Sequence, residues 1–159
     1  MNPSVDDRLN SVLRALETVV LPALPSSASL AHEQVMLAMG HIQIVQAQRD
    51  ATPGFEQGEL DDIRSLALAL LALDDAPHSC AAERTALRDA VETESEDPRA
   101  AAEAVRLAID DLLVTARQAG ELAYQSALSR TILPLARERA AKDRAWFAIM
   151  GFDIDLSAA

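Results

Sequence analysis

The chain has 159 residues, which fits one domain and allows a core large enough to fold unaided. Its formal net charge of −11 at pH 7 disfavours contact with nucleic acids and anionic membranes, so we expect neither as a partner. Hydrophobic residues make up 50% of the chain but aromatic residues only 3%, so the core must be built mainly from aliphatic side chains. Ala and Leu are the most frequent residues, and together with Arg and Glu they favour helices. We predict an all-α fold, a single-domain bundle of about six helices over residues 1–159, with proline-kinked first and last long helices.

The first predicted helix spans residues 5–20, where apolar residues recur at three- and four-residue steps and form one stripe. Asn2 or Ser4 can cap its start. Pro22 kinks or ends it, because proline lacks the backbone N–H that a helix requires. A second helix is predicted at 28–49. Its apolar residues surround the axis, so we expect it to be the most buried helix of the chain.

Two of the three histidines, His32 and His41, lie in this second helix. At about 100° per residue they point to opposite sides, so they cannot share one metal ion. His41 shares its side with Gln34 and Gln48 at seven-residue steps. This polar seam predicts a hydrogen-bonded layer that fixes the register of helix packing. The alternative is the polar lining of a small-molecule cavity, with His41 as an orienting donor.

Apolar spacing predicts a third helix that includes residues 60–73, and Ser79 can cap a short fourth helix. The acidic residues 92–97 predict an exposed loop. Asp97 followed by Pro98 predicts the start of a fifth helix, since the first can cap it and the second fits its first turn. The residues of this helix that we expect to face the core are Val105, Ile109, Leu112 and Ala116.

Gly120 fits the end of the fifth helix, and a sixth is predicted over residues 121–150, with a kink at Pro134. Residues 151–159 form a C-terminal tail. Aromatic side chains gather where the helix meets this tail, namely Trp146, Phe147 and Phe152. Core packing would explain them. The alternative is that they anchor an interface, where large aromatic side chains are enriched.

Basic residues recur along one side of the sixth helix at seven-residue steps; they are Arg130, Arg137 and Arg144. Such a line of guanidinium groups could clamp a phosphate or carboxylate group. The alternative is a solvated face on which ion pairs neutralise part of the charge. The pairs at helical spacing are Glu138 with Lys142 and Arg139 with Asp143.

Cys80 is the lone cysteine, so no disulfide can form within the chain. The N-terminal residues lack the basic and apolar regions of a signal peptide, and we expect a cytoplasmic protein. Cys80 follows a predicted helix cap and lies near His78, where a thiol could act as a nucleophile. The alternative is a small residue packed at a helix start. Lys142 is the sole lysine among 14 basic residues, and an Arg-rich, Lys-poor composition is typical of GC-rich bacterial genomes.

Residues 16–50, "LETVVLPALPSSASLAHEQVMLAMGHIQIVQAQRD", resemble the start of an uncharacterised bacterial all-helical family. In that family a first helix ends in a V-x-P-A-L-like element, and a second, apolar helix ends in an Arg-rich step. Its members are often encoded near aminoglycoside-phosphotransferase-like kinases and acyl-CoA dehydrogenases. The resemblance implies a small accessory protein and brings no catalytic residues with it.

The sequence contains no Gly-rich phosphate loop, dinucleotide fingerprint, zinc-type Cys/His spacing or Ser elbow. We therefore expect no catalytic residue, cofactor or metal. The favoured function is a non-catalytic interaction or accessory module that forms a homo-oligomer or binds an enzyme partner. The alternative is a binding protein or enzyme for a carboxylate or phosphate ligand, with a cavity lined by the second and sixth helices. That cavity would use His41, Gln34 and an arginine from the line described above.

Overall fold

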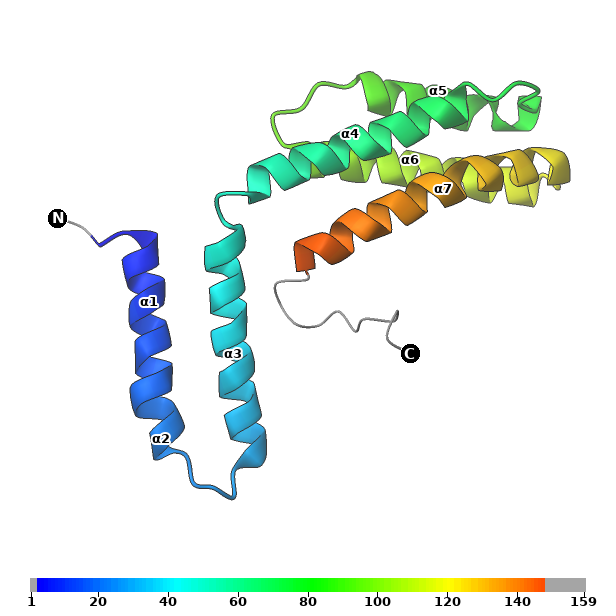
Figure 1. Ribbon diagram of the computed structural model, residues 1–159. Helices are drawn as coiled ribbons and strands as arrows, with labels where there is room; N and C mark the ends of the chain where they lie inside the picture. The colour runs from blue at the N-terminus through cyan, green and yellow to red at the C-terminus, as the bar shows by residue number, and fades with distance from the viewer. Residues whose placement is uncertain (1–2, 148–159) are drawn as a thin grey trace. The chain divides into compact units, whose positions relative to one another are not determined.

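The computed structural model describes residues 3–147 and is all-α, which confirms the predicted fold class; this range holds no strand (Figure 1). The chain divides into two compact units. We call residues 3–52 the N-terminal hairpin and Pro53–Trp146 the four-helix unit. The predicted tail, residues 151–159, lies outside the described residues. Within the described part of the chain, no helix is both long and apolar enough to span a membrane.

The first arm of the N-terminal hairpin is a nearly continuous helix made of α1 (Val5–Ala15), the π-helical turn η1 (Leu16–Val20) and α2 (Leu21–Ala23). Ser4 caps it, as predicted. The Ser4 hydroxyl oxygen accepts from the Asp7 N–H at 3.1 Å, and the Asp7 carboxylate accepts from the Ser4 N–H at 2.9 Å. Two hydrogen bonds to the Asp7 carboxylate, first the one from the Ser4 backbone N–H and then one from the Ser4 hydroxyl, hold the pKa of Asp7 below its ordinary value. The wider π-turn ends two residues before Pro22, which cannot donate a helical hydrogen bond.

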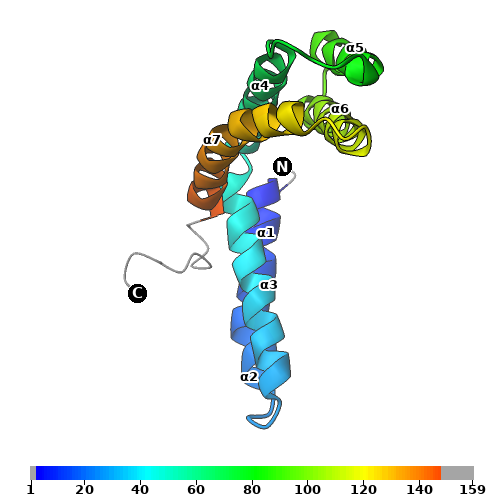
Figure 2. The same ribbon diagram turned by 90° about the vertical axis from the view of Figure 1, so that its right-hand side faces the viewer.

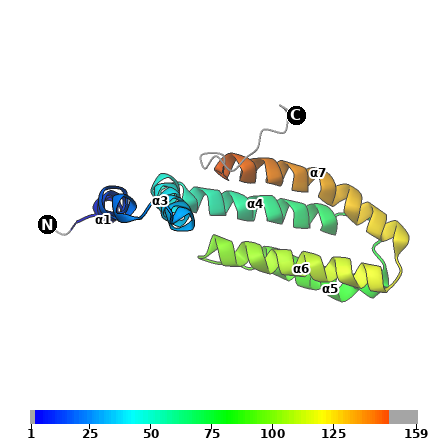
Figure 3. The same cartoon turned by 90° about the horizontal axis from the view of Figure 1, so that it is seen from below.

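The second arm of the hairpin is α3 (Ser29–Gln48), which runs antiparallel beside α1 (Figures 1 and 3). Gln46 Nε2 donates to Asn10 Oδ1 at 3.0 Å, and Arg49 pairs with Asp6 at 2.6 Å. The prediction that this helix is the most buried is wrong, because none of its residues is buried. Within the hairpin only the first arm packs against α3, and one neighbouring helix covers one side.

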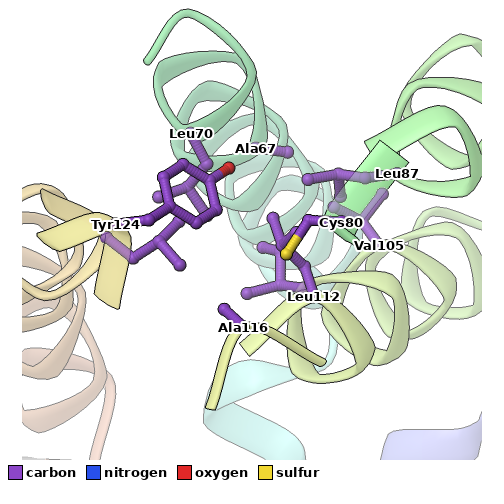
Figure 4. Close-up of a cluster of buried hydrophobic side chains, with 10 residues drawn as sticks. Ala67, Leu70, Cys80, Leu87, Val105, Leu112, Ala116 and Tyr124 are labelled. Atoms are coloured by element: carbon purple, nitrogen blue, oxygen red, sulfur yellow. The ribbon is translucent and has the colours of Figure 1, made fainter. Parts of the chain in front are cut away.

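The four-helix unit contains α4 (Thr52–Leu71), the 3-10 turn η2 (His78–Cys80), α5 (Ala81–Glu92), α6 (Pro98–Gln118) and α7 (Leu122–Phe147). Side chains from all of these elements form one buried cluster (Figure 4). Its buried members are Ala67, Leu70, Cys80, Leu87, Val105, Ile109, Leu112, Ala116, Tyr124 and Leu128. All four core-facing residues predicted for the fifth helix are among them, so that prediction is confirmed. The most buried helix of the described chain is therefore α6, not α3.

The ends of α6 also follow the predictions. The Asp97 carboxylate accepts from the N–H groups of Arg99 and Ala100 at 3.0 and 3.1 Å, and Pro98 occupies the first turn. Gly120 takes a φ of 73°, a left-handed conformation that glycine adopts without strain.

The start of α5 differs from the prediction. Ser79 does not cap this helix, because its hydroxyl donates to Glu121 Oε1 at 3.2 Å and Cys80 occupies the capping position without a side-chain hydrogen bond. The last helix, α7, continues through Pro134 and curves rather than breaking (Figure 2).

Candidate functional site

A groove of about 280 Å³ lies between α4, α6 and α7 in the four-helix unit. Its apolar floor is formed by Ile63, Leu66, Leu135, Ala136 and Ala140. Charged side chains surround this floor, namely Glu59, Asp62, Arg106, Glu138, Arg139, Lys142 and Asp143. The groove therefore combines aliphatic surface with charges of both signs, and we treat it as the candidate site.

Asp62 on α4 is the centre of the charged rim. Its carboxylate accepts from Arg139 at 3.2 Å and from Lys142 at 2.6 and 2.8 Å. Lys142 thus pairs across the groove, and not with Glu138 as the helical spacing suggested. The predicted pair of Arg139 and Asp143 is confirmed. The hydrogen bond to Asp143 is the main reason why the pKa of Arg139 is raised above its ordinary value.

A second ion pair joins α6 to α4. The guanidinium of Arg106 lies 2.5 Å from the carboxylate of Glu59, which is partly buried. Arg106 also reaches Glu103 on its own helix at 3.5 Å. Ion pairs therefore join α4 to α6 through Glu59 and to α7 through Asp62.

Two aromatic side chains stack on each other, one near the start of α4 and the other near the end of α7. The rings of Phe55 and Trp146 stack with centroids 4.2 Å apart and planes 16° from parallel. The guanidinium carbon of Arg139 lies 4.7 Å from the centroid of Phe55, within the range of a cation–π interaction. Trp146 therefore packs within the four-helix unit. Phe147 is 50% exposed, and Phe152 lies outside the described residues.

The charges around the groove limit its chemistry. Arg106, Arg139 and Lys142 each already face a carboxylate, so an anionic ligand would have to compete with Asp62 or Glu59. The hydroxyl of Ser65, which also lines the groove, donates to a backbone carbonyl at 2.8 Å. The charged side chains on the rim therefore mainly hold α4 to α6 and α7.

The residues predicted to bind a ligand fall into different units. Gln34 and His41 are exposed on α3 of the N-terminal hairpin, so they do not form a buried polar layer within it. The three arginines of the predicted clamp, Arg130, Arg137 and Arg144, are exposed on α7 of the four-helix unit. None of these five residues lines the groove, so their joint role as a binding site stays a prediction.

Cys80 lies in the buried cluster and has no exposed surface (Figure 4). Burial raises the pKa of its thiol, and a protonated, enclosed thiol is a poor nucleophile near neutral pH. The interpretation of Cys80 as a small packed residue is therefore confirmed. Across residues 3–147, no group of three or more His, Cys, Asp or Glu side chains is arranged to hold a metal ion.

Sequence reasoning missed the α4 side of the groove. Phe55, Glu59 and Asp62 follow one another at four- and three-residue steps and so share one side of the helix. That spacing, together with the scarcity of aromatic residues, was the available signal. Their partners on α6 and α7 are far away in the sequence, and no local pattern identifies them.

No protein family, curated protein or solved structure matches the chain.

Proposed function

We propose that this chain is a non-catalytic protein-interaction module that self-associates through its N-terminal hairpin. One observation carries the proposal: no described side chain of α1, η1, α2 or α3 is buried. The four-helix unit, by contrast, has a continuous buried cluster. Short helices are marginally stable without tertiary packing, so a hairpin with no core requires a surface to pack against.

The exposed surface of the hairpin has the composition of an interface. Leu30 is 68% and Met36 58% exposed, and further valines on α1 and η1 are exposed as well. Over the whole length of α3, Glu33 is the only residue with a formal charge at neutral pH when histidines are neutral. Apolar surface with few charges is typical of the centre of a protein interface.

A second copy of the chain is the occupant that we propose. Burying an exposed Leu, Val or Met side chain contributes about 1.5–3 kcal/mol. A second hairpin offers the same apolar surface, and two hairpins can together form a helical bundle with two-fold symmetry. The four-helix unit is then free to bind an enzyme partner, in the accessory role that the resemblance implies.

Sedimentation velocity of the purified full-length chain over a wide concentration range tests this proposal. We expect the sedimentation coefficient to rise from that of a monomer to that of a dimer as concentration increases. A chain that remains monomeric at the highest concentration would overturn the homo-oligomer.

The groove supports a second candidate, a carboxylate- or phosphate-binding protein. Its volume of about 280 Å³ suits a small molecule, and Arg106, Arg139 and Lys142 lie on its rim. Calorimetric titration with inorganic phosphate and with citrate tests this candidate. It requires saturable binding that is lost in Arg139→Gln, and heats no larger than those of dilution would argue against it.

We also propose a cytoplasmic location in a bacterial cell. The lone, buried Cys80 needs no oxidising compartment, and the arginine-rich composition supports the bacterial origin. Cell fractionation of the tagged chain would test the location, and recovery in a secreted fraction would contradict it.

A further inference from the structure

Helix α3 has two opposite sides, and one of them already has a partner. Gln46 and Arg49 contact Asn10 and Asp6 of the first arm, so they mark the side that faces α1. Stepping back along the helix by four and three residues places others on that side. They are Ile42, Met39, Val35 and His32, all only partly exposed.

The opposite side of α3 carries a complete heptad pattern, which we call the outer seam. Its residues, separated alternately by four and three positions, are Leu30, Gln34, Leu37, His41, Ile44 and Gln48. Leu30 is 68% and Leu37 43% exposed, Gln34 and His41 are exposed as well, and Ile44 and Gln48 at its end are half-buried. A seam of this spacing is the surface by which helices pair in coiled coils.

We propose that the outer seam pairs with the outer seam of a second copy as a parallel two-stranded coiled coil. This inference rests on the proposed function and specifies the surface and its geometry. The aliphatic residues Leu30, Leu37 and Ile44 occupy heptad position d, and the polar residues Gln34, His41 and Gln48 occupy position a. In a parallel pair each residue meets its own counterpart, so leucine packs on leucine while glutamine and histidine meet partners that can hydrogen-bond.

An antiparallel pair centred on Met39 matches the seam less well. It would set Leu37 opposite His41, and Gln34 opposite Ile44, of the second copy. Each polar group would then face an aliphatic side chain and lose hydrogen bonds to water without replacement. Polar residues at this heptad position are a known means of fixing register and strand number.

The residues beside the outer seam permit close approach. They are Ala31, Ala38, Gly40, Val45 and Ala47, with Glu33 as the only charge. A Cβ built on Gly40 would meet no atom within 4 Å, so the backbone there is open to a neighbour. Each helix therefore brings only one charge, that of Glu33, to the edge of the seam, and repulsion between like charges is small.

The length of the seam sets the strength of the pairing. From Leu30 to Gln48 it extends about 28 Å, and a helix about 10 Å wide presents a footprint of about 280 Å². Stable interfaces bury about 800 Å² on each partner. We therefore expect a reversible dimer whose population depends on concentration.

Sedimentation velocity of two neighbouring variants tests the surface. Leu37→Glu places a charge in the outer seam and should weaken dimerisation by about 100-fold or more. Met36→Glu makes the same change one residue away and off the seam, at a side chain that is 58% exposed, and should keep the dimer. Circular dichroism of both variants at low concentration controls for folding, and the expected spectra match that of the unmodified chain.

The outcomes separate this inference from the proposed function. If the unmodified chain and both variants are all dimers, the outer seam is not the interface, although self-association stands. If the unmodified chain is a monomer, both proposals fail.

Cysteine cross-linking tests the direction of the pair. In a Cys80→Ala background, Leu30→Cys should form an intermolecular disulfide on mild oxidation, because residues 30 of a parallel pair are adjacent. In the antiparallel pair each would lie opposite residue 48, far beyond the reach of a disulfide. Met36→Cys, off the seam, should not cross-link. Failure of Leu30→Cys to cross-link in a sample that still sediments as a dimer would overturn the parallel arrangement.

Discussion

The guanidinium of Arg84 on α5 donates to the hydroxyl oxygen of Tyr124 on α7 at 2.9 Å. The same group donates to the carbonyl oxygens of Leu70 and Leu71 at the end of α4, at 3.2 and 2.6 Å. One side chain thus donates to two carbonyl groups at a helix end, where intrahelical donors run out, and it joins three helices of the four-helix unit.

We expect Arg84→Met to lower the free energy of unfolding by about 2–3 kcal/mol, because it takes the Arg84 donor away from the Leu71 carbonyl and the Tyr124 hydroxyl. Tyr124→Phe should cost only about 1 kcal/mol, since Arg84 keeps its carbonyl acceptors. Urea denaturation followed by circular dichroism measures both. Equal losses in the two variants would contradict this division of roles.

The buried thiol of Cys80 makes stability depend on pH at the alkaline end. Its pKa is raised by burial above the ordinary value of 9.0, so the unfolded chain loses the proton first. The stabilisation is therefore complete below pH 9.0 and is lost as the pH rises from that value through the higher pKa of the folded chain. Urea denaturation at increasing pH should reveal this decline in the unmodified chain and a shallower one in Cys80→Ala. An identical slope in the two proteins would show that other groups cause it.

Thiol reactivity gives an independent measurement on the same residue. Because Cys80 has no exposed surface, we expect an alkylating reagent at neutral pH to react slowly in buffer and rapidly in denaturant. A fast reaction in buffer would mean that the thiol is accessible in the folded chain.

Asp62 should control how firmly the C-terminal half of α7 is attached. Asp62→Asn removes the ion pairs to Arg139 and Lys142, and partly exposed pairs of this kind contribute about 1 kcal/mol. We expect faster amide hydrogen exchange in residues 135–147, measured by mass spectrometry. Raising the ionic strength should have the same effect on the unmodified chain and less effect on the variant.

A matched control is available at the next position. Asp61 is exposed and accepts from Gln57 on its own helix at 2.9 Å, so Asp61→Asn should leave exchange in α7 unchanged. Equal acceleration in both variants would mean that net charge, and not the contact with α7, is responsible.

His41 should limit the strength of the proposed dimer. His41→Ile replaces a polar residue of the outer seam with a β-branched one, which favours two-stranded coiled coils at this heptad position. We expect about tenfold tighter dimerisation in sedimentation experiments. Gln43→Ile, an exposed change off the seam, is the control and should have no such effect. A dimer unaffected by His41→Ile would place His41 outside the interface.

The sequence predicted the four-helix unit better than the hairpin, for a physical reason. Helix α6 has its core residues at three- and four-residue steps and its charged residues on other sides, so its apolar stripe identified Val105 and Leu112 as core residues without knowledge of their neighbours. The apolar residues of α3 surround its axis, and this pattern does not distinguish a helix that neighbours surround within its own chain from one with an exposed apolar surface. Its burial was therefore predicted wrongly.

The candidate groove could not be predicted as a whole, because it depends on pairs between distant residues. Local spacing found the pair of Arg139 and Asp143, which lie one helical turn apart. It assigned Lys142 to Glu138, whereas Asp62 is the actual partner, supplied by a helix eighty residues earlier in the chain. A carboxylate from another helix competes on equal terms with a local one, and only the tertiary arrangement decides between them.

Helix α3 contacts α1 on one side and carries its heptad pattern on the other. Both sides keep their direction along the whole helix only if the number of residues in it stays the same. Inserting or deleting one residue near the middle of α3 would turn everything beyond that point by about 100°. Gln46 and Arg49 would then swing away from Asn10 and Asp6, and the opposite stripe would be split at the same point. Evolution should therefore tolerate many substitutions in α3 but few changes in its length, and should confine insertions to the turn at residues 24–28.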